Sequence, residues 1–225
     1  MKIQSVVDIV TKHIRNKIIH GVLTSGQRIT ETDIMEDLNI SRSPIREALK
    51  ILESEGLITI KPRKGAYVSE VTPNDIWEIY TVNAALNFQA IDLVMNIISA
   101  EDIRKLEDFL KRMEEGVYQE PGDVEKYRKY HRMFHENLLQ IAGNKRLRQI
   151  CSSLDNQTSK FSKIIFSSRD YLIASFQKHK EILEAIKIND RELAKRVTYE
   201  HVIEGMKNLQ NILQNQKSEG ESNER

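Results

Sequence analysis

The 225-residue sequence predicts a mainly α protein, with an N-terminal winged helix-turn-helix over residues 1–72 and a C-terminal antiparallel all-helical bundle over residues 73–215. Apolar residues recur at helical spacing through most of the chain, and short β-prone runs follow Gly56. No run after residue 72 resembles a strand, and Thr72 can cap a helix whose first turn contains Pro73. The polar end, residues 216–225, is expected to be disordered.

Two helices are predicted before residue 40. The first carries an apolar stripe and ends near Gly21, because glycine is favoured just after a helix C-terminus. The second runs from Glu31 to Leu38, with Thr30 available as its N-terminal cap and Asn39 marking a turn. The stripe of the first helix consists of Val7, Val10, Ile14 and Ile18.

The segment that follows this turn predicts a recognition helix. Ser43 can cap a helix whose first position is Pro44, where a missing N–H has no cost. An apolar stripe then faces a small core, while Arg42, Arg46 and Lys50 can point elsewhere, which suits a helix in a DNA major groove. The apolar stripe consists of Ile45, Ala48, Leu49 and Leu52.

A β-hairpin with a basic tip is predicted next. Residues 57–60 and 66–68 are the two β-prone runs, and Lys61-Pro62-Arg63-Lys64-Gly65 separates them. A hairpin in this position is the wing of a winged helix-turn-helix.

Seven residues are candidates for DNA binding. Arg42 and Arg46 are expected to read bases, because a guanidinium can donate two hydrogen bonds to guanine O6 and N7. Phosphate contacts are expected from the hydroxyls of Ser41 and Ser43. The alternative for any single basic residue is an ordinary solvated charge, but position within the motif favours DNA contact. The wing contributes Arg63 and Lys64 beside Gly65, which lets the main chain approach the minor groove or a phosphate.

Residues 6–72 resemble the winged helix-turn-helix of the GntR family of bacterial transcription regulators. The string Ser41-Arg42-Ser43-Pro44-Ile45-Arg46-Glu47-Ala48-Leu49 carries the resemblance, with Glu55-Gly56-Leu57 and Arg63-Lys64-Gly65-Ala66-Tyr67-Val68. The resemblance implies a homodimer that binds a double-stranded DNA operator containing an inverted repeat.

Composition agrees with this interpretation without requiring it. The net charge is only +1, and residues 1–72 contain 11 Lys and Arg against 9 Asp and Glu, a difference of +2. Attraction to DNA must therefore come from local placement of charge. A single cysteine, Cys151, and the lack of a secretion signal or an apolar run long enough for a membrane span predict a cytoplasmic protein without a membrane partner.

The second part of the chain carries four histidines that could meet. His131 and His135 are four residues apart on one predicted helix, so their imidazoles project from the same face. His179 and His201 belong to two later helices with apolar stripes. Imidazoles grouped in this way can bind Zn²⁺ or Ni²⁺, although a single buried histidine is more often only hydrogen-bonded. The expected helices span residues 73–98, 100–116, 123–142, 145–166, 171–188 and 190–213.

This part resembles the FCD effector domain of the FadR-type branch of the same family, through Phe134-His135, Ala142-Gly143-Asn144 and the segment from His179 to Ile186 followed by His201. The resemblance implies a divalent metal held by one Asp and three His, with a small organic acid completing the site. His131 stands where the family has Asp, which favours Zn²⁺ or Ni²⁺ over harder ions. Asn83 stands where the family often has Arg, and it is the candidate effector-binding residue.

We therefore expect a sequence-specific DNA-binding transcription regulator, a repressor controlled by a small ligand at a divalent metal. Three alternatives remain at this point: a regulator that senses the metal itself, a regulator whose site is empty and whose bundle packs around an apolar ligand or serves only for dimerisation, and a metal-dependent enzyme. Neither a His-Glu-x-x-His motif nor a Gly-rich phosphate loop occurs near the histidines, so no catalytic residue is assigned and an enzyme is not expected.

Overall fold

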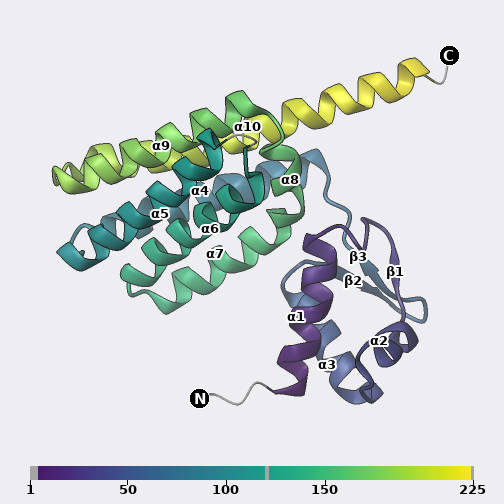
Figure 1. Cartoon of the computed structure of the whole chain (residues 1–225). Helices are drawn as coiled ribbons and strands as arrows, with labels where there is room; N and C mark the ends of the chain where they lie inside the picture. Colours follow the sequence, from purple (N-terminus) through teal and green to yellow (C-terminus); the bar gives the residue numbers. More distant parts are fainter. Residues whose placement is uncertain (1–4, 120–121, 224–225) are drawn as a thin grey trace. The chain divides into compact units, whose positions relative to one another are not determined.

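The computed structural model describes residues 5–119 and 122–223. The chain forms two compact units, Met1–Thr72 with Ser153–Lys160, and Pro73–Ser152 with Phe161–Arg225. We call them the winged unit and the helical unit (Figure 1). None of the helices within the described ranges combines the length and apolar character that a membrane crossing requires.

The winged unit combines three helices with a small antiparallel sheet. Strand order is β1-β3-β2, with Arg28 opposite Tyr67 and Ile60 opposite Ala66. The hairpin of β2 and β3 confirms the predicted wing. The two-residue strand β1 was not predicted, because so short a run has no periodicity of its own. The elements are α1 Val6–Ile19, β1 Arg28–Ile29, α2 Glu31–Leu38, α3 Arg42–Ser54, β2 Ile58–Lys61 and β3 Gly65–Val68.

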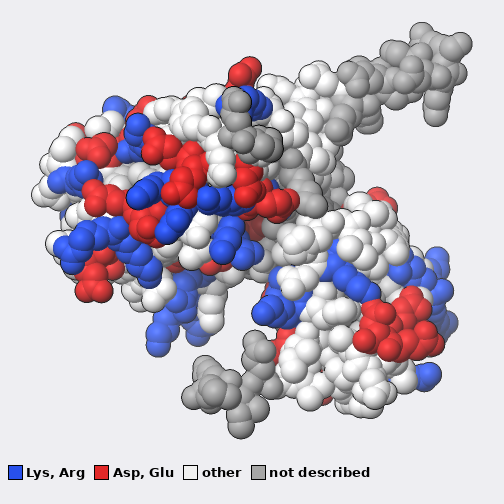
Figure 2. Space-filling model, in the orientation of Figure 1, with Lys and Arg blue, Asp and Glu red and all other residues white. Residues whose placement is uncertain are grey.

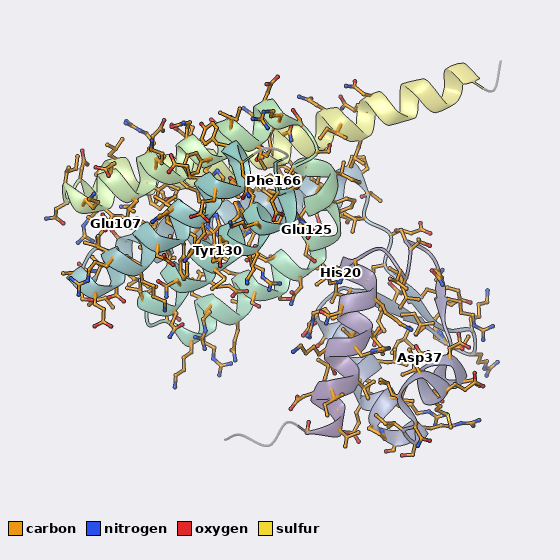
Figure 3. All side chains as sticks on the ribbon, viewed as in Figure 1. His20, Asp37, Glu107, Glu125, Tyr130 and Phe166 are labelled. Carbon is orange, nitrogen blue, oxygen red and sulfur yellow. The ribbon has the colours of Figure 1, made fainter. Side chains whose placement is uncertain are left out.

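One hydrophobic core holds the winged unit together. The predicted stripes of α1 and α3 face this core, and Ile14, Ile45 and Leu52 are fully buried in it. Burial of such side chains contributes about 1.5–3 kcal/mol each. Polar contacts join the same helices at the rim. Asp37 on α2, labelled in Figure 3, accepts hydrogen bonds from Lys17 and His13 of α1, which lower the pKa of this carboxyl.

The recognition helix α3 begins two residues earlier than predicted. Its N-cap is Ser41, whose hydroxyl makes no capping hydrogen bond, and Ser43 lies inside the first turn. The expectation that Ser43 caps the helix was therefore wrong. Pro44 is the third helical residue, a position whose N–H also has no partner within the helix, so proline interrupts no hydrogen bond there. Residues before proline usually avoid helical geometry, which made the later start look favourable.

The helical unit contains no strand within its described residues. Its helices lie side by side in Figure 1, and α4 packs on α6 and α10 while α5 packs on α6 and α9. Figure 2 shows Lys and Arg interspersed with Asp and Glu on the visible face of this unit, as expected of solvated helix surfaces. The elements after residue 72 are α4 Pro73–Val94, α5 Ala100–Tyr118, α6 Val124–Ile141, α7 Lys145–Thr158, η1 Ser159–Phe161, α8 Ser162–Ile165, α9 Arg169–Lys187 and α10 Arg191–Asn223, of which Ser153–Lys160 in α7 and η1 belongs to the winged unit.

Two of the predicted helix boundaries differ clearly from the structure. The helix expected over residues 145–166 is divided after Thr158 into α7, the 3₁₀ turn η1 and α8. Thr158 and Ser159 direct their hydroxyls to main-chain carbonyls of α7, which competes with regular helical hydrogen bonding. At the other end, α10 continues to Asn223 through most of the tail expected to be disordered. Adding residues to an existing helix needs no new nucleation, so the polar composition did not stop it.

Candidate nucleic-acid interface and metal centre

The exposed side of α3 carries the predicted DNA-reading arginines. Arg42, Ser43 and Arg46 are exposed, whereas the apolar stripe of the same helix is buried. The side chain of Arg46 is 62% exposed, and the Ser41 hydroxyl makes no capping bond. The helix therefore presents two guanidiniums and two hydroxyls from its first turns, as a groove-binding helix requires.

The wing places the other predicted residues at a tight turn. The N–H of Lys64 donates to the carbonyl oxygen of Lys61 at 3.0 Å, and both Arg63 and Gly65 have positive φ, 60° and 103°. Arg63, Lys64 and Gly65 are all exposed. Glycine adopts this backbone without strain, so Gly65 lets the wing turn sharply and leaves the two basic side chains at the tip.

A hollow of about 490 Å³ opens between α3, β1 and the wing. Four cationic residues line it, namely Arg28, Arg42, Arg46 and Lys50. Arg28 was not among the predicted residues, since one basic residue in a two-residue strand gives no sequence signal. In the structure its Nε lies 3.5 Å from the point where a Cβ of Gly65 would stand, so it adds charge beside the wing tip.

Glu31 is the acidic residue in this hollow. It is the first residue of α2, and its Oε1 accepts a hydrogen bond from Nε of Arg46 at 2.7 Å. This contact raises the pKa of Arg46 above its ordinary value. Sequence reasoning missed this pair, because its members lie 15 residues apart on different helices.

The four predicted histidines come together inside the helical unit. The nitrogen atoms of His131, His135, His179 and His201 that could bind a metal lie within 4.8 Å of one another. His131 and His135 come from α6, His179 from α9 and His201 from α10. His179 and His201 are buried, and the other two are half-buried. We call this group the histidine cluster.

Burial keeps the histidine cluster uncharged. It lowers the pKa of His135 to about 4 and that of His201 to about 3, and it holds the pKa values of His131 and His179 well below 6.5. Repulsion between neighbouring imidazolium charges acts in the same direction for three of the four histidines. Neutral imidazole is the form that binds metal ions, so the donor set is ready without loss of protons near pH 7.

Aromatic rings and one backbone carbonyl surround the cluster. Phe166, labelled in Figure 3, lies just after α8 with its ring centroid 5.0 Å from that of His131. Phe134 lies 5.2 Å from His179 by the same measure. The carbonyl oxygen of Ser175 lies 2.6 Å from Nδ1 of His179, and Nε2 of His179 lies 3.0 Å from Nε2 of His135. A largely apolar wall therefore encloses polar nitrogens that converge on one point, as in many ligand sites.

Asn83 is buried on α4, the helix that packs against α6 and α10. Its Oδ1 and its carbonyl oxygen both accept hydrogen bonds from Nδ2 of Asn87 at 2.9 Å. The residue is thus in the interior of the helical unit, and its role in effector binding stays a prediction.

A winged helix-turn-helix with cationic residues on its recognition helix, together with a helical unit whose four histidines could hold a metal ion, is the arrangement of a DNA-binding transcription regulator. Residues 7–68 match the family model "Bacterial regulatory proteins, gntR family", and residues 78–204 match the model "FCD domain". The chain belongs to the GntR family of regulators, in its FCD-containing branch, and is not an enzyme.

Relatives and solved structures agree with this assignment. An uncharacterised HTH-type regulator of Bacillus subtilis, YdhC, is 29% identical over 202 residues, which cover 89% of each chain. The gluconate operon transcriptional repressor of B. subtilis is 29% identical over 191 residues, covering 82% of this chain and 76% of the relative. The structure of Escherichia coli McbR/YncC has the same fold, with a TM-score of 0.80, 21% identity, and coverage of 92% of this chain and 98% of the other.

Proposed function

We propose that this regulator is a homodimeric repressor whose operator affinity is set by a small organic acid bound at a divalent metal in the histidine cluster. The convergence of four neutral imidazoles in a buried site is the observation that carries the proposal. Four imidazole donors suit Zn²⁺ or Ni²⁺ better than Mg²⁺ or Mn²⁺, which prefer oxygen. Because the partner we propose is DNA, we also propose that the protein acts in the bacterial cytoplasm.

The residues present fit such an ion. Nδ1 of His179 must be protonated, since a carbonyl oxygen can only accept, and this leaves the lone pair of Nε2 directed toward His135. A metal-binding histidine is usually supported in this way, by a hydrogen bond from the ring nitrogen that does not bind the metal. A bound divalent ion would supply positive charge for a carboxylate ligand. No carboxylate belongs to the group of ligating side chains found among the described residues, so an anionic effector would provide the missing negative charge.

Names of relatives support repression. The gluconate operon regulator of B. subtilis and the RspR regulator of E. coli are both named transcriptional repressors. A homodimer with a two-fold axis would present two winged units to the two halves of an inverted repeat. A ligand that binds one arrangement of these units more tightly than another would then change operator affinity.

The experiment is an operator-binding titration. Duplexes bound by the wild-type chain are first enriched from a random double-stranded library, and the apparent Kd of the selected duplex is then measured by fluorescence anisotropy. Four conditions are compared: after chelation, after chelation with gluconate added, with Zn²⁺, and with Zn²⁺ plus gluconate. We expect a carboxylate to change the Kd only when metal is present. A change caused by Zn²⁺ alone would support a metal sensor instead, and a Kd insensitive to all four conditions would contradict ligand control at this site.

A further inference from the structure

A carboxylate holds the inner part of the Arg46 side chain and leaves its outer end free. Oε1 of Glu31 accepts from Nε of Arg46 at 2.7 Å, with the Glu31 side chain 29% exposed and that of Arg46 62% exposed. Within the described part of the chain, the Nη1 and Nη2 groups of Arg46 have no hydrogen-bond acceptor. Glu31 therefore restrains the inner part of a side chain that is 62% exposed, and no bond to the described residues engages its two terminal nitrogens.

Local structure fixes where Glu31 stands. Thr30 caps α2 by accepting a hydrogen bond from the N–H of Asp33 at 3.2 Å, and Ile29 just before it belongs to the sheet and is buried. Glu31 is thus the first residue of a helix that starts directly after a strand. A negative charge at a helix N-terminus is favoured by the helix dipole, so the carboxylate is stable in this position.

The restraint has a consequence for base recognition. An arginine reads guanine through two parallel N–H groups that meet O6 and N7. With Nε engaged by Glu31, the two terminal nitrogens of Arg46 remain as the pair that can do so. A flexible arginine loses rotational freedom when it binds a base, whereas a restrained one has already lost part of it. Restraint of this kind favours the base contact over looser contacts with phosphates.

Whereas the restraint favours recognition of a base, the negative charge of Glu31 lowers the affinity for DNA of any sequence. The hollow contains Arg28, Arg42, Arg46 and Lys50, and the carboxylate partly cancels their attraction for phosphate. An acidic residue there lowers affinity that does not depend on sequence. An acidic residue in this position is therefore favourable for a regulator only if it improves selection among DNA sequences.

We propose that Glu31 is a positioning residue for base readout by Arg46, so that it raises specificity while it lowers affinity for DNA in general. The inference rests on the proposed function only in its DNA-binding part and is independent of metal and effector. It adds a residue on α2 to the readout set, although that residue need not contact a base.

The test uses the full chain and the duplex that the wild type enriches from a random library, with a scrambled duplex of equal length and composition as the non-specific probe. Glu31→Ala removes both charge and acceptor, whereas Glu31→Gln removes the charge but keeps an oxygen that can accept from Nε. Glu36→Ala is the matched control, because Glu36 is an exposed acid on the same helix. Unchanged thermal unfolding monitored by circular dichroism verifies that each variant is folded.

We expect Glu31→Ala to weaken binding to the selected duplex roughly tenfold, within the range for a good bidentate contact. Binding to the scrambled duplex should stay equal or become tighter. Glu31→Gln should retain most of the specific affinity, and Glu36→Ala should leave the ratio of the two affinities unchanged. In an Arg46→Ala background, Glu31→Ala should cause no further loss of specificity, because the residue acts through Arg46.

Three results would overturn the inference. Equal tightening of both duplexes by Glu31→Ala and Glu31→Gln would show that the carboxylate only repels phosphate. A loss of specificity that persists without Arg46 would show that Glu31 acts by another route. A wild-type chain that enriches no sequence would contradict the proposed function itself, and the inference with it.

Discussion

Nδ1 of His179 donates a hydrogen bond to the carbonyl oxygen of Ser175, four residues earlier on α9, over 2.6 Å. This bond fixes the tautomer of a buried imidazole and the plane of its ring, because the carbonyl has no proton to offer. The other nitrogen is directed at His135, 3.0 Å away. A backbone atom thus orients His179 with its Nε2 toward another histidine of the cluster, as the proposed metal site requires.

Replacing His131 should change which metal the protein prefers. The His131→Asp variant restores the carboxylate that the family resemblance implies, and a hard oxygen donor favours Mn²⁺ relative to Zn²⁺. We expect the ratio of Mn²⁺ to Zn²⁺ affinity, measured by competition dialysis, to rise in this variant. His131→Asn is the control because it has the same shape without the charge. Equal ratios in the two variants would show that position 131 does not bind the ion.

The loss of a base contact and the loss of a phosphate contact should affect DNA affinity differently, in their dependence both on DNA sequence and on salt concentration. Arg46→Ala is expected to weaken binding to the selected duplex roughly five- to a hundredfold and to affect the scrambled duplex much less. Lys64→Ala on the wing should weaken both duplexes to a similar degree and reduce the slope of log K against log salt by about 1. Anisotropy titrations over a salt series measure both. If the two variants behaved alike on both duplexes, the assignment of Arg46 to base readout would fail.

Replacing Arg28 should weaken DNA binding in the same way as replacing Lys64. It lies beside Gly65 in the cationic hollow and has no protein acceptor that would restrain it among the residues described. We therefore expect Arg28→Ala to reduce affinity for both duplexes and to lower the salt slope. Lys12→Ala, an exposed cation on α1 outside the hollow, is the matched control. An effect of Arg28→Ala no larger than that of the control would remove Arg28 from the interface.

The close approach of α5 and α6 should make Gly116 intolerant of a side chain. A Cβ there would stand 2.9 Å from both the carbonyl oxygen of Asp123 and the main-chain nitrogen of Tyr127, and main chain moves less easily than a side chain. We expect Gly116→Ala to lower the free energy of unfolding by about 1–3 kcal/mol, as overpacking does. Urea unfolding measures this loss.

Gly205→Ala on α10 provides the contrast. Its Cβ would meet only side-chain atoms, the nearest being the Tyr171 hydroxyl at 3.1 Å. Alanine favours a helix over glycine by up to about 1 kcal/mol, so this variant should be neutral or slightly more stable. Equal destabilisation by both substitutions would contradict the backbone explanation for Gly116.

Elements with strong periodicity or motif chemistry could be predicted from the sequence. The stripe of α3, the hairpin around Gly65 and the four-residue spacing of His131 and His135 each depend on local pattern, and the structure has all three. Thr30 caps α2 as expected, because its hydroxyl faces an N–H only three residues away.

Features that depend on contacts between distant residues could not be predicted. The Glu31–Arg46 bond and the placement of Arg28 beside Gly65 require the folded sheet and helices, so no spacing indicates them. The interruption after Thr158 arises from hydroxyl groups that compete for backbone carbonyls, and such competition is decided by the surrounding packing. The start of α3 at Arg42 was missed for another reason, because the weak preference of Ser43 for extended backbone before proline does not decide where this helix begins.

The measurement that tests the proposed ligand control most directly is the metal content of the purified protein. Protein prepared without a metal-affinity tag or chelator is analysed by elemental mass spectrometry, beside a His135→Ala, His179→Ala double variant and a His20→Ala control on the exposed side of the winged unit. We expect about one Zn²⁺ or Ni²⁺ ion per protomer in the wild type and the control, and almost none in the double variant. A wild-type content near zero, even after Zn²⁺ or Ni²⁺ is supplied and the excess removed, would contradict a metal-based effector site.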